Sequence, residues 1–208
     1  MKPILSSLIP FLAILNPFAL CLYLAHVMEE LDTRTFLIVF GKASLVSFLV
    51  FCLFAAAGEP LLTDFLSVRP EAMRIFGGII FFIVAYGYVT KGYRATEVLR
   101  GSLDELPSEI AVPFMIGAGT ITQAILLGKA HGAARATLVL FTGMAVSVLI
   151  VLAFKHIADR MRGPRERVFV RYVNIASRLN GLLIGAISTD MVVGGVRRLW
   201  VGSGVLGS

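Results

Sequence analysis

The feature that most constrains this chain is a set of long apolar runs that carry almost no charge. No Lys, Arg, Asp or Glu lies between Lys2 and Glu29, and the stretches 110–128 and 136–154 contain none at all. A helix needs about 20 apolar residues to cross the hydrocarbon of a bilayer, whereas strands of a membrane barrel would show alternating segments of about 10 residues. The sequence therefore predicts an all-α integral membrane protein.

We expect a bundle of six transmembrane helices that forms a single membrane domain over residues 1–208. The six runs that predict these helices are 3–28, 35–58, 75–90, 110–128, 136–154 and 179–196. The first run is too long for the apolar part of a signal peptide, and no cleavage site with small residues follows it, so we expect the run to be retained.

The composition argues against most soluble classes of protein. Hydrophobic residues make up 57% of the 208 positions and charged residues 15%, whereas a soluble domain is about 25% charged. Basic loops beside anionic lipid explain the net charge of +6, so no nucleic-acid partner is expected. Cys21 and Cys52 lie in apolar runs, and no metal-ligand, nucleotide-binding or hydrolytic motif occurs. We therefore expect no cofactor, no metal site and no enzyme activity.

The distribution of Lys and Arg predicts the orientation in the membrane. Of the two sides that the six spans define, one carries seven basic residues and the other carries twelve. Basic loops favour the cytoplasmic side, so both termini are expected outside the cytoplasm of an inner (plasma) membrane protein. Much of the difference comes from residues 155–178, which are predicted to form a basic cytoplasmic loop. Lipid headgroups are its main expected contact, and RNA or protein docking is the alternative.

A short motif occurs twice in the chain. Residues 74–77 and 178–181 both read Arg-x-x-Gly and are followed by large aliphatic residues, at an offset of 104 positions. The same offset carries Asn16-Pro17 onto Thr120-Ile121, just after Gly117-Ala118-Gly119. Residues that interrupt helices therefore occur in the corresponding first and fourth spans.

This correspondence predicts two repeats, residues 1–92 and residues 108–198. Each repeat would hold three spans, so the second must cross the membrane in the opposite sense to the first. Inverted repeats with broken first and fourth helices are a common plan of secondary transporters. Chance similarity is the alternative, because the motif is short.

The residues at the two interruptions are candidates for binding a solute. Pro17 removes a backbone donor in mid-span, and Asn16 places a polar side chain there; a structural kink is the alternative. The segment Gly117-Ala118-Gly119-Thr120 would expose backbone N–H groups that suit a carboxylate, and close helix packing is the alternative. The side chains of Thr120 and Gln123 would offer further hydrogen bonds to the solute.

Asp190 is the only acidic residue inside a predicted span. An ionisable group at that depth is a candidate for carrying a proton or binding an amino group, and an ion pair with a basic residue such as Arg197 is the alternative. Gly181 and Gly185 form a GxxxG pattern on the same helix, which permits a homo-oligomer.

The chain resembles the MarC family (UPF0056) of six-span bacterial inner-membrane proteins. The segments that carry the resemblance run in order along nearly the whole chain: 14–19 (Ile-Leu-Asn-Pro-Phe-Ala), 58–62 (Gly-Glu-Pro-Leu-Leu), 74–79 (Arg-Ile-Phe-Gly-Gly-Ile), 116–122 (Ile-Gly-Ala-Gly-Thr-Ile-Thr) and 178–183 (Arg-Leu-Asn-Gly-Leu-Leu) with Gly194. Three positions depart from the family pattern, since Ala19 stands for a glycine, Ala118 for a proline and Asp190 for a frequent glutamine.

The resemblance implies a secondary transporter, because some similar proteins carry small neutral amino acids such as glycine and alanine. It also implies that Asn16 and residues 117–120 contribute to the solute site. We therefore expect alternating access to a small polar solute, with membrane lipids as the other partner and with Asp190 binding either the amino group of the solute or a coupling proton. The alternatives are a non-transporting membrane scaffold and a channel for a small solute.

Overall fold

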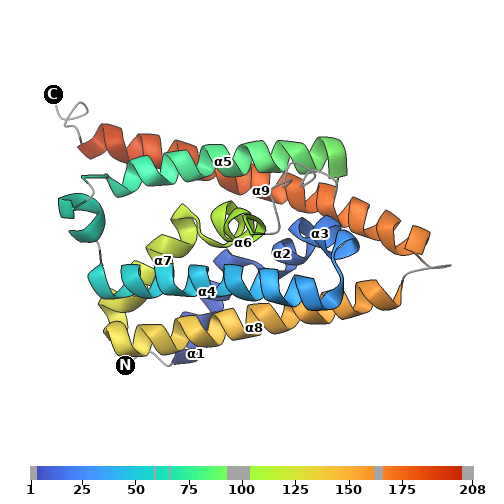
Figure 1. Ribbon diagram of the computed structural model, residues 1–208. Coiled ribbons are helices and arrows are strands. Elements are labelled where there is room, and N and C mark those ends of the chain that lie inside the picture. The colour runs from blue at the N-terminus through green and yellow to red at the C-terminus, as the bar shows by residue number, and fades with distance from the viewer. Residues whose placement is uncertain (1–3, 59, 66, 93–103, 162–165, 203–208) are drawn as a thin grey trace.

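The computed structural model describes residues 4–58, 60–65, 67–92, 104–161 and 166–202, and these residues form helices and short connections without strands (Figure 1). The all-α class predicted from the sequence is confirmed. The α-helices are α1 (Ile4–Leu15), α2 (Pro17–Tyr23), α3 (Ala25–Glu30), α4 (Thr33–Ala57), α5 (Pro70–Lys91), α6 (Leu106–Ile110), α7 (Ala118–His131), α8 (Ala133–Arg160) and α9 (Glu166–Gly202), with π-helical turns η1 (Leu61–Phe65) and η3 (Ala111–Met115).

The helices form three layers (Figure 1). The long helices α5 and α9 pack against each other in one outer layer, and α4 and α8 pack against each other in the opposite layer. The short helices lie between them, where α7 contacts α4, α8 and α5, and α2 contacts α8 and α9. The interrupted segments therefore occupy the centre of the bundle.

Five helical stretches are long and apolar enough to span a membrane. They are Ser6–Tyr23, which contains the break at Asn16 between α1 and α2, and Thr33–Ala57, Pro70–Lys91, Ala133–Arg160 and Arg167–Trp200. The predicted fourth span, 110–128, is not a continuous helix, because the chain kinks at Val112 and α7 has 14 residues. A helix of that length extends about 21 Å, which is shorter than a hydrocarbon core of about 30 Å. The count of six spanning helices is therefore not confirmed.

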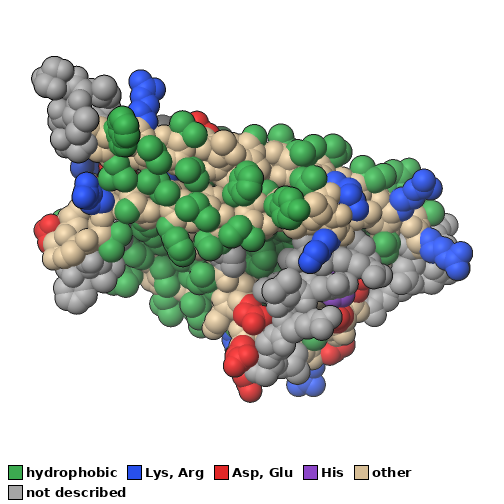
Figure 2. Space-filling view, turned by 90° about the horizontal axis from the view of Figure 1, so that it is seen from above, with side chains coloured by type: hydrophobic (Ala, Val, Ile, Leu, Met, Phe, Trp, Pro, Cys, Tyr) green, Lys and Arg blue, Asp and Glu red, His purple; other side chains and the backbone are tan. Residues whose placement is uncertain are grey.

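The outer surface is apolar, as a lipid-facing surface must be. Large hydrophobic side chains with more than half of their surface exposed include Phe76 on α5, Leu149 on α8 and Leu182 on α9. From above, hydrophobic side chains cover the middle of the bundle, while Lys and Arg side chains gather toward its two ends (Figure 2). An exposed apolar belt of this kind would aggregate in water and is stable in a bilayer.

The predicted basic loop at residues 155–178 is mostly helical, which differs from the expectation. Helix α8 continues to Arg160 and α9 begins at Glu166, while residues 162–165 lie outside the described residues. Arg is a good helix former, so the charges do not end a helix. The apolar side chain of Phe169 within this stretch also packs, since its ring centroid lies 5.8 Å from that of Phe154, the residue just before the stretch.

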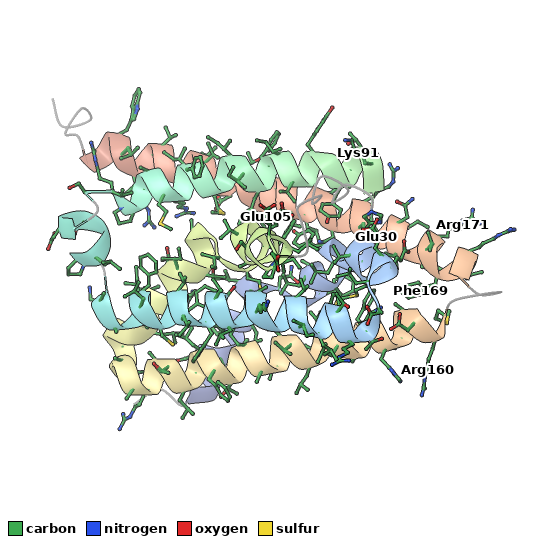
Figure 3. All side chains as sticks on the ribbon, viewed as in Figure 1. Glu30, Lys91, Glu105, Arg160, Phe169 and Arg171 are labelled. Atoms are coloured by element: carbon green, nitrogen blue, oxygen red, sulfur yellow. The ribbon has the colours of Figure 1, made fainter. Side chains whose placement is uncertain are left out.

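Basic and acidic side chains of four helices mark one end of the bundle. Figure 3 shows Glu30, Lys91, Arg160 and Arg171 at that end, where α3 and α5 finish, α8 finishes and α9 begins. The ends of α3, α5 and α8 and the start of α9, which the charge distribution assigned to one side of the membrane, therefore lie together.

Glycines allow α5 and α9 to approach closely. A Cβ on Gly78 would lie 2.8 Å from Val192 Cγ2, and a Cβ on Gly181 would lie 2.9 Å from Tyr88 Cβ. The Gly181 face of the predicted GxxxG pattern is thus occupied by α5 of the same chain.

Candidate functional site

The first interruption lies at Asn16, as the Asn-Pro sequence predicted. Asn16 adopts a left-handed conformation (φ 46°, ψ 73°), which asparagine tolerates better than most residues. Its side-chain oxygen accepts a hydrogen bond of 3.1 Å from the N–H of Ala19 and so caps α2. Pro17 occupies the first position of α2, where its missing N–H has no helical partner to lose. The dipeptide therefore ends one helix and starts the next.

The second interruption lies between Met115 and Ala118, also within a segment that the sequence singled out. Ile116 and Gly117 have extended backbones, and Thr120 closes the turn: its hydroxyl oxygen accepts from the Gly117 N–H at 2.9 Å and lies 2.9 Å from the Met115 carbonyl. The offset of 104 positions aligned Pro17 with Ile121, whereas the second helix begins three residues earlier, at Ala118.

The two interruptions lie beside each other. A Cβ added to Gly119 would lie 3.0 Å from Ile14 Cγ2, so the last turn of α1 touches the first turn of α7. Gly77 of α5 meets the same turn, since a Cβ there would lie 2.9 Å from Ala118 Cβ. The structure therefore brings the candidate residues Asn16, Pro17 and 117–120 into one region of the bundle.

The first turn of α7 carries backbone N–H groups that have no acceptor within the helix. The N–H groups of Ala118, Gly119 and Thr120 precede the first helical hydrogen bond, which Ile121 donates to the Gly117 carbonyl at 3.0 Å. Such groups and the positive end of the helix dipole favour an anionic oxygen.

A cavity of about 440 Å³ lies between this turn and α5. Its walls are almost entirely apolar, and it is lined by Met73, Phe76, Gly77, Ile80, Phe81, Val112, Ile116, Gly117, Ala118 and Ile121. The site thus combines backbone donors with walls that suit a small apolar group. The side chain of Thr120 is 5% exposed and is held in the turn, so it shapes the site rather than lining it.

Gln123 lies elsewhere, in a second cavity of about 440 Å³ between α1 and α7. Ser6, Ser7, His131 and Arg135 also line this cavity, and the Ser7 hydroxyl and His131 Nε2 are 2.8 Å apart. The structure therefore separates Gln123 from the cavity beside α5.

Asp190 lines none of these cavities. Its side chain is 82% exposed, and one carboxylate oxygen lies 3.4 Å from Arg74 Nη2 near the start of α5. The partner is therefore Arg74 rather than Arg197, which the sequence offered as an alternative. Its sequence neighbour Met191 faces inward, because a Cβ on Gly77 would lie 3.7 Å from Met191 Cε.

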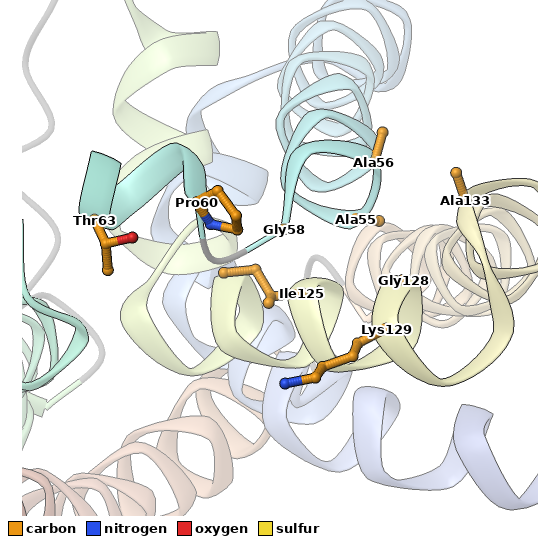
Figure 4. Close-up of a pocket in the computed structure, with 9 residues that line it drawn as sticks. All are labelled: Ala55, Ala56, Gly58, Pro60, Thr63, Ile125, Gly128, Lys129 and Ala133. Carbon is orange, nitrogen blue, oxygen red and sulfur yellow. The ribbon is translucent and has the colours of Figure 1, made fainter. Parts of the chain in front are cut away.

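A third cavity, of about 570 Å³, lies where α4 ends against α7. Figure 4 shows Pro60 and Thr63 on the segment after α4, with Ile125 and Lys129 on α7 across from them. The two helices touch at Gly128, where a Cβ would lie 1.9 Å from the Ala55 carbonyl oxygen.

Sequence reasoning missed a buried lysine at the opposite end of the bundle. Lys155 is 2% exposed, and its ammonium group donates to the carbonyls of Met28 (2.8 Å) and Leu31 (3.0 Å) and to Asp159 (2.7 Å). Thr33 donates to the same carboxylate at 2.9 Å. These bonds tie α3 and the start of α4 to α8. Apolar residues before Lys155 at helical spacing were the available signal that it belonged to a helix rather than a loop.

Sequence reasoning also missed a small cluster of buried polar side chains between α2 and α9. The Tyr23 hydroxyl is hydrogen-bonded to the Asn180 side chain. Among the described residues, Asn180 Nδ2 and Ser177 Oγ are buried without a hydrogen-bond partner. The polar residues Ser177 and Asn180 occur at a three-residue spacing in an apolar helix, which was a usable signal.

The family model described as "MarC family integral membrane protein" matches residues 1–200. The chain belongs to the MarC family. Its similarity to curated proteins extends over whole chains: a UPF0056 membrane protein of Pyrococcus horikoshii is 27% identical over 197 residues, covering 94% of each chain. The UPF0056 inner membrane protein YhgN of Escherichia coli is 24% identical over 203 residues, covering 97% of this chain and 99% of its own.

This MarC protein is thus a multi-pass membrane protein, and its relative YhgN is named an inner membrane protein. A further relative, from Aquifex aeolicus, is 27% identical over 206 residues. The printed names of these relatives mention no solute. No solved structure matches the chain.

Proposed function

We propose that this MarC protein is a secondary transporter of a small polar solute, which binds where the two helix interruptions meet. The observation that carries the proposal is the contact between Ile14 and Gly119, beside the backbone donors of α7 and the cavity next to α5. Helices broken near the centre of a bundle supply such donors without placing a charge in the membrane.

The proposed solute is a small neutral amino acid. Its carboxylate would accept hydrogen bonds from N–H groups of the first turn of α7, where Ala118 borders the cavity, and its small side chain would lie against the apolar walls beside Gly77. The resemblance of the chain to transporters of glycine and alanine supports this class. Asn16 would hold the neighbouring interruption open, because its side chain caps α2.

Alternating access would come from two inverted halves. In support, the arginines of the repeated motif make reciprocal contacts: Arg74 reaches Gly194 near the end of α9, and Arg178 donates to the Val89 carbonyl at 2.8 Å near the end of α5. An inverted repeat requires such exchanged contacts at matching positions. The proposal includes both termini outside the cytoplasm, with the Lys91 and Arg160 end inside.

Asp190 is the proposed coupling group. Protonation of its carboxylate would release Arg74 and loosen the contact between α5 and α9 at this end. A proton gradient would then bias the packing of the two long helices against each other.

The test is uptake of labelled glycine, alanine and serine into proteoliposomes, with and without an inward proton gradient. We expect saturable uptake that rises with the gradient, falls in Asn16→Ala and loses its gradient dependence in Asp190→Asn. The control is Asp64→Asn, since Asp64 is also exposed but lies in η1, away from both interruptions. Absence of uptake by folded protein would favour the scaffold, and uptake without saturation would favour the channel.

A further inference from the structure

The groove between α1 and α7 has a polar end and an apolar flank. Its cavity of about 440 Å³ has Ser6, Ser7, His131 and Arg135 near the helix ends, and Pro10 and Leu126 further along. This cavity shares only α7 with the solute site beside α5, and none of its lining residues lines that site.

The polar end lies at the depth of lipid headgroups. Helix α8 has 28 residues and so extends about 42 Å, roughly 12 Å more than the hydrocarbon core. About four residues at each of its ends therefore lie among headgroups, and Arg135 is the third residue of α8. His131 is the last residue of α7, and Ser7 lies in the first turn of α1.

The charge of the groove favours an anion. No acidic side chain is among the described residues that line it, so the Arg135 guanidinium faces a cavity without a negative group. Arginine presents a fork of N–H donors that matches phosphate oxygens. The Ser7 hydroxyl and the His131 ring, whose Nε2 lies 2.8 Å from the Ser7 oxygen, add polar groups beside it.

The flank of the groove favours an acyl chain. Leu126 is 49% exposed and Ile9, on the adjacent face of α1, is 62% exposed. A soluble anion needs no apolar strip of this kind next to its charge, whereas a lipid has its phosphate and its hydrocarbon in that order.

We propose that this groove binds an anionic phospholipid, with its phosphate at Arg135 and one acyl chain along Ile9 and Leu126. Binding would join the end of α1 to the α7–α8 corner. The inference does not depend on what the protein transports.

The test measures thermal stabilisation of the detergent-solubilised protein by phosphatidylglycerol, phosphatidylcholine and inorganic phosphate. We expect phosphatidylglycerol to raise Tm more than the other two additions, and Arg135→Gln to weaken its apparent affinity by about fivefold, the factor expected for one Arg near an anionic headgroup. Arg197→Gln is the matched control, because Arg197 is exposed near the same end of the bundle but lies on α9. Equal stabilisation by inorganic phosphate would show that the site binds a free anion. An equal loss of affinity for phosphatidylglycerol in Arg197→Gln would show that the effect comes from general surface charge. Either result would overturn the proposal.

A second measurement locates the lipid without relying on stability. In a Trp200→Phe background, Leu126→Trp places the only tryptophan in the groove, and Leu149→Trp places it on the exposed surface of α8 as a control. We expect brominated phosphatidylglycerol to quench the tryptophan at position 126 more strongly than brominated phosphatidylcholine does, with no such preference at position 149. Equal quenching by both lipids at position 126 would contradict a specific site.

Discussion

Replacing Lys155 with methionine should destabilise the protein strongly although Lys155 is far from the proposed solute site. The lysine is 2% exposed and donates three hydrogen bonds, to two backbone carbonyls and to Asp159. Methionine keeps most of the volume of the side chain but leaves the carbonyls of Met28 and Leu31 and one carboxylate oxygen without this donor.

The expected loss follows from the three bonds. A hydrogen bond to a charged group contributes about 1.5–3 kcal/mol, and breaking a buried ion pair costs about 3–5 kcal/mol. Asp159 is 26% exposed and keeps its bond from Thr33, so water and the hydroxyl compensate part of the loss. We therefore expect about 3 kcal/mol for Lys155→Met, or a fall in Tm of about 6–12 °C for a chain of this size.

Thermal unfolding in detergent measures this loss directly. The matched control is Lys91→Met, because Lys91 is exposed at the same end of the bundle and should change stability by less than about 0.5 kcal/mol. Asp159→Asn should cost less than Lys155→Met, since the amide oxygen of the variant would remain an acceptor for Lys155, and the Thr33 hydroxyl oxygen could accept from the amide nitrogen in the other position. A difference of about 0.5 kcal/mol corresponds to a Tm shift of about 2 °C for a chain of this size. If the Tm of Lys155→Met lies within about 2 °C of the Tm of Lys91→Met, the three hydrogen bonds do not hold the helices together.

Three further predictions concern helix contacts and caps. Gly128→Val should prevent the normal packing of α4 and α7, because its Cβ would lie 1.9 Å from the Ala55 carbonyl oxygen. The yield of folded protein in detergent, measured as the monodisperse peak in size-exclusion chromatography, should therefore fall sharply. Gly41→Ala should stabilise α4 by about 0.5–1 kcal/mol in thermal unfolding, since nothing lies within 4 Å of the new methyl group and alanine favours helix; a lower Tm would contradict this reasoning. The Asp32 carboxylate caps α4, and hydrogen bonds from the Thr35 side chain and backbone hold its pKa below the usual 3.8. The stability that the ionised cap contributes should be complete at pH values above 3.8 and should be lost as the pH falls through the lower folded pKa. Asp32→Ala should therefore lower Tm less at pH 2 than at pH 7, and an equal effect at both pH values would show that the charge is not involved.

The helix interruptions could be predicted because their causes are local. Asn16 tolerates the left-handed conformation that ends α1, Pro17 suits the first position of α2, and Gly117 takes an extended conformation at little cost. The long apolar runs predicted membrane helices for the same reason, since the need to satisfy backbone groups in lipid acts on every span.

The partners of the polar residues could not be predicted, because they depend on how distant helices pack. Asp190 pairs with Arg74, which is 116 positions away, and Lys155 reaches carbonyls more than 120 positions earlier. Charge counting assigned Lys155 to a loop because it used the sign of the charge and not the apolar pattern around it. The place of Gln123 likewise depends on which face of α7 meets α1, which a short segment with two glycines does not specify.

The most direct test of the central claim is solute uptake by a variant that fills the contact between the two interruptions. Gly119→Val adds a branched side chain where even a Cβ would lie 3.0 Å from Ile14, whereas Gly41→Val, the control, adds one where nothing lies within 4 Å. The account predicts that Gly119→Val folds but loses uptake of labelled glycine or alanine by about tenfold, the effect of ~1.4 kcal/mol on the barrier, while Gly41→Val transports like the parent. Uptake by folded Gly119→Val equal to that of the parent would contradict a solute site at the meeting point of the two helix interruptions.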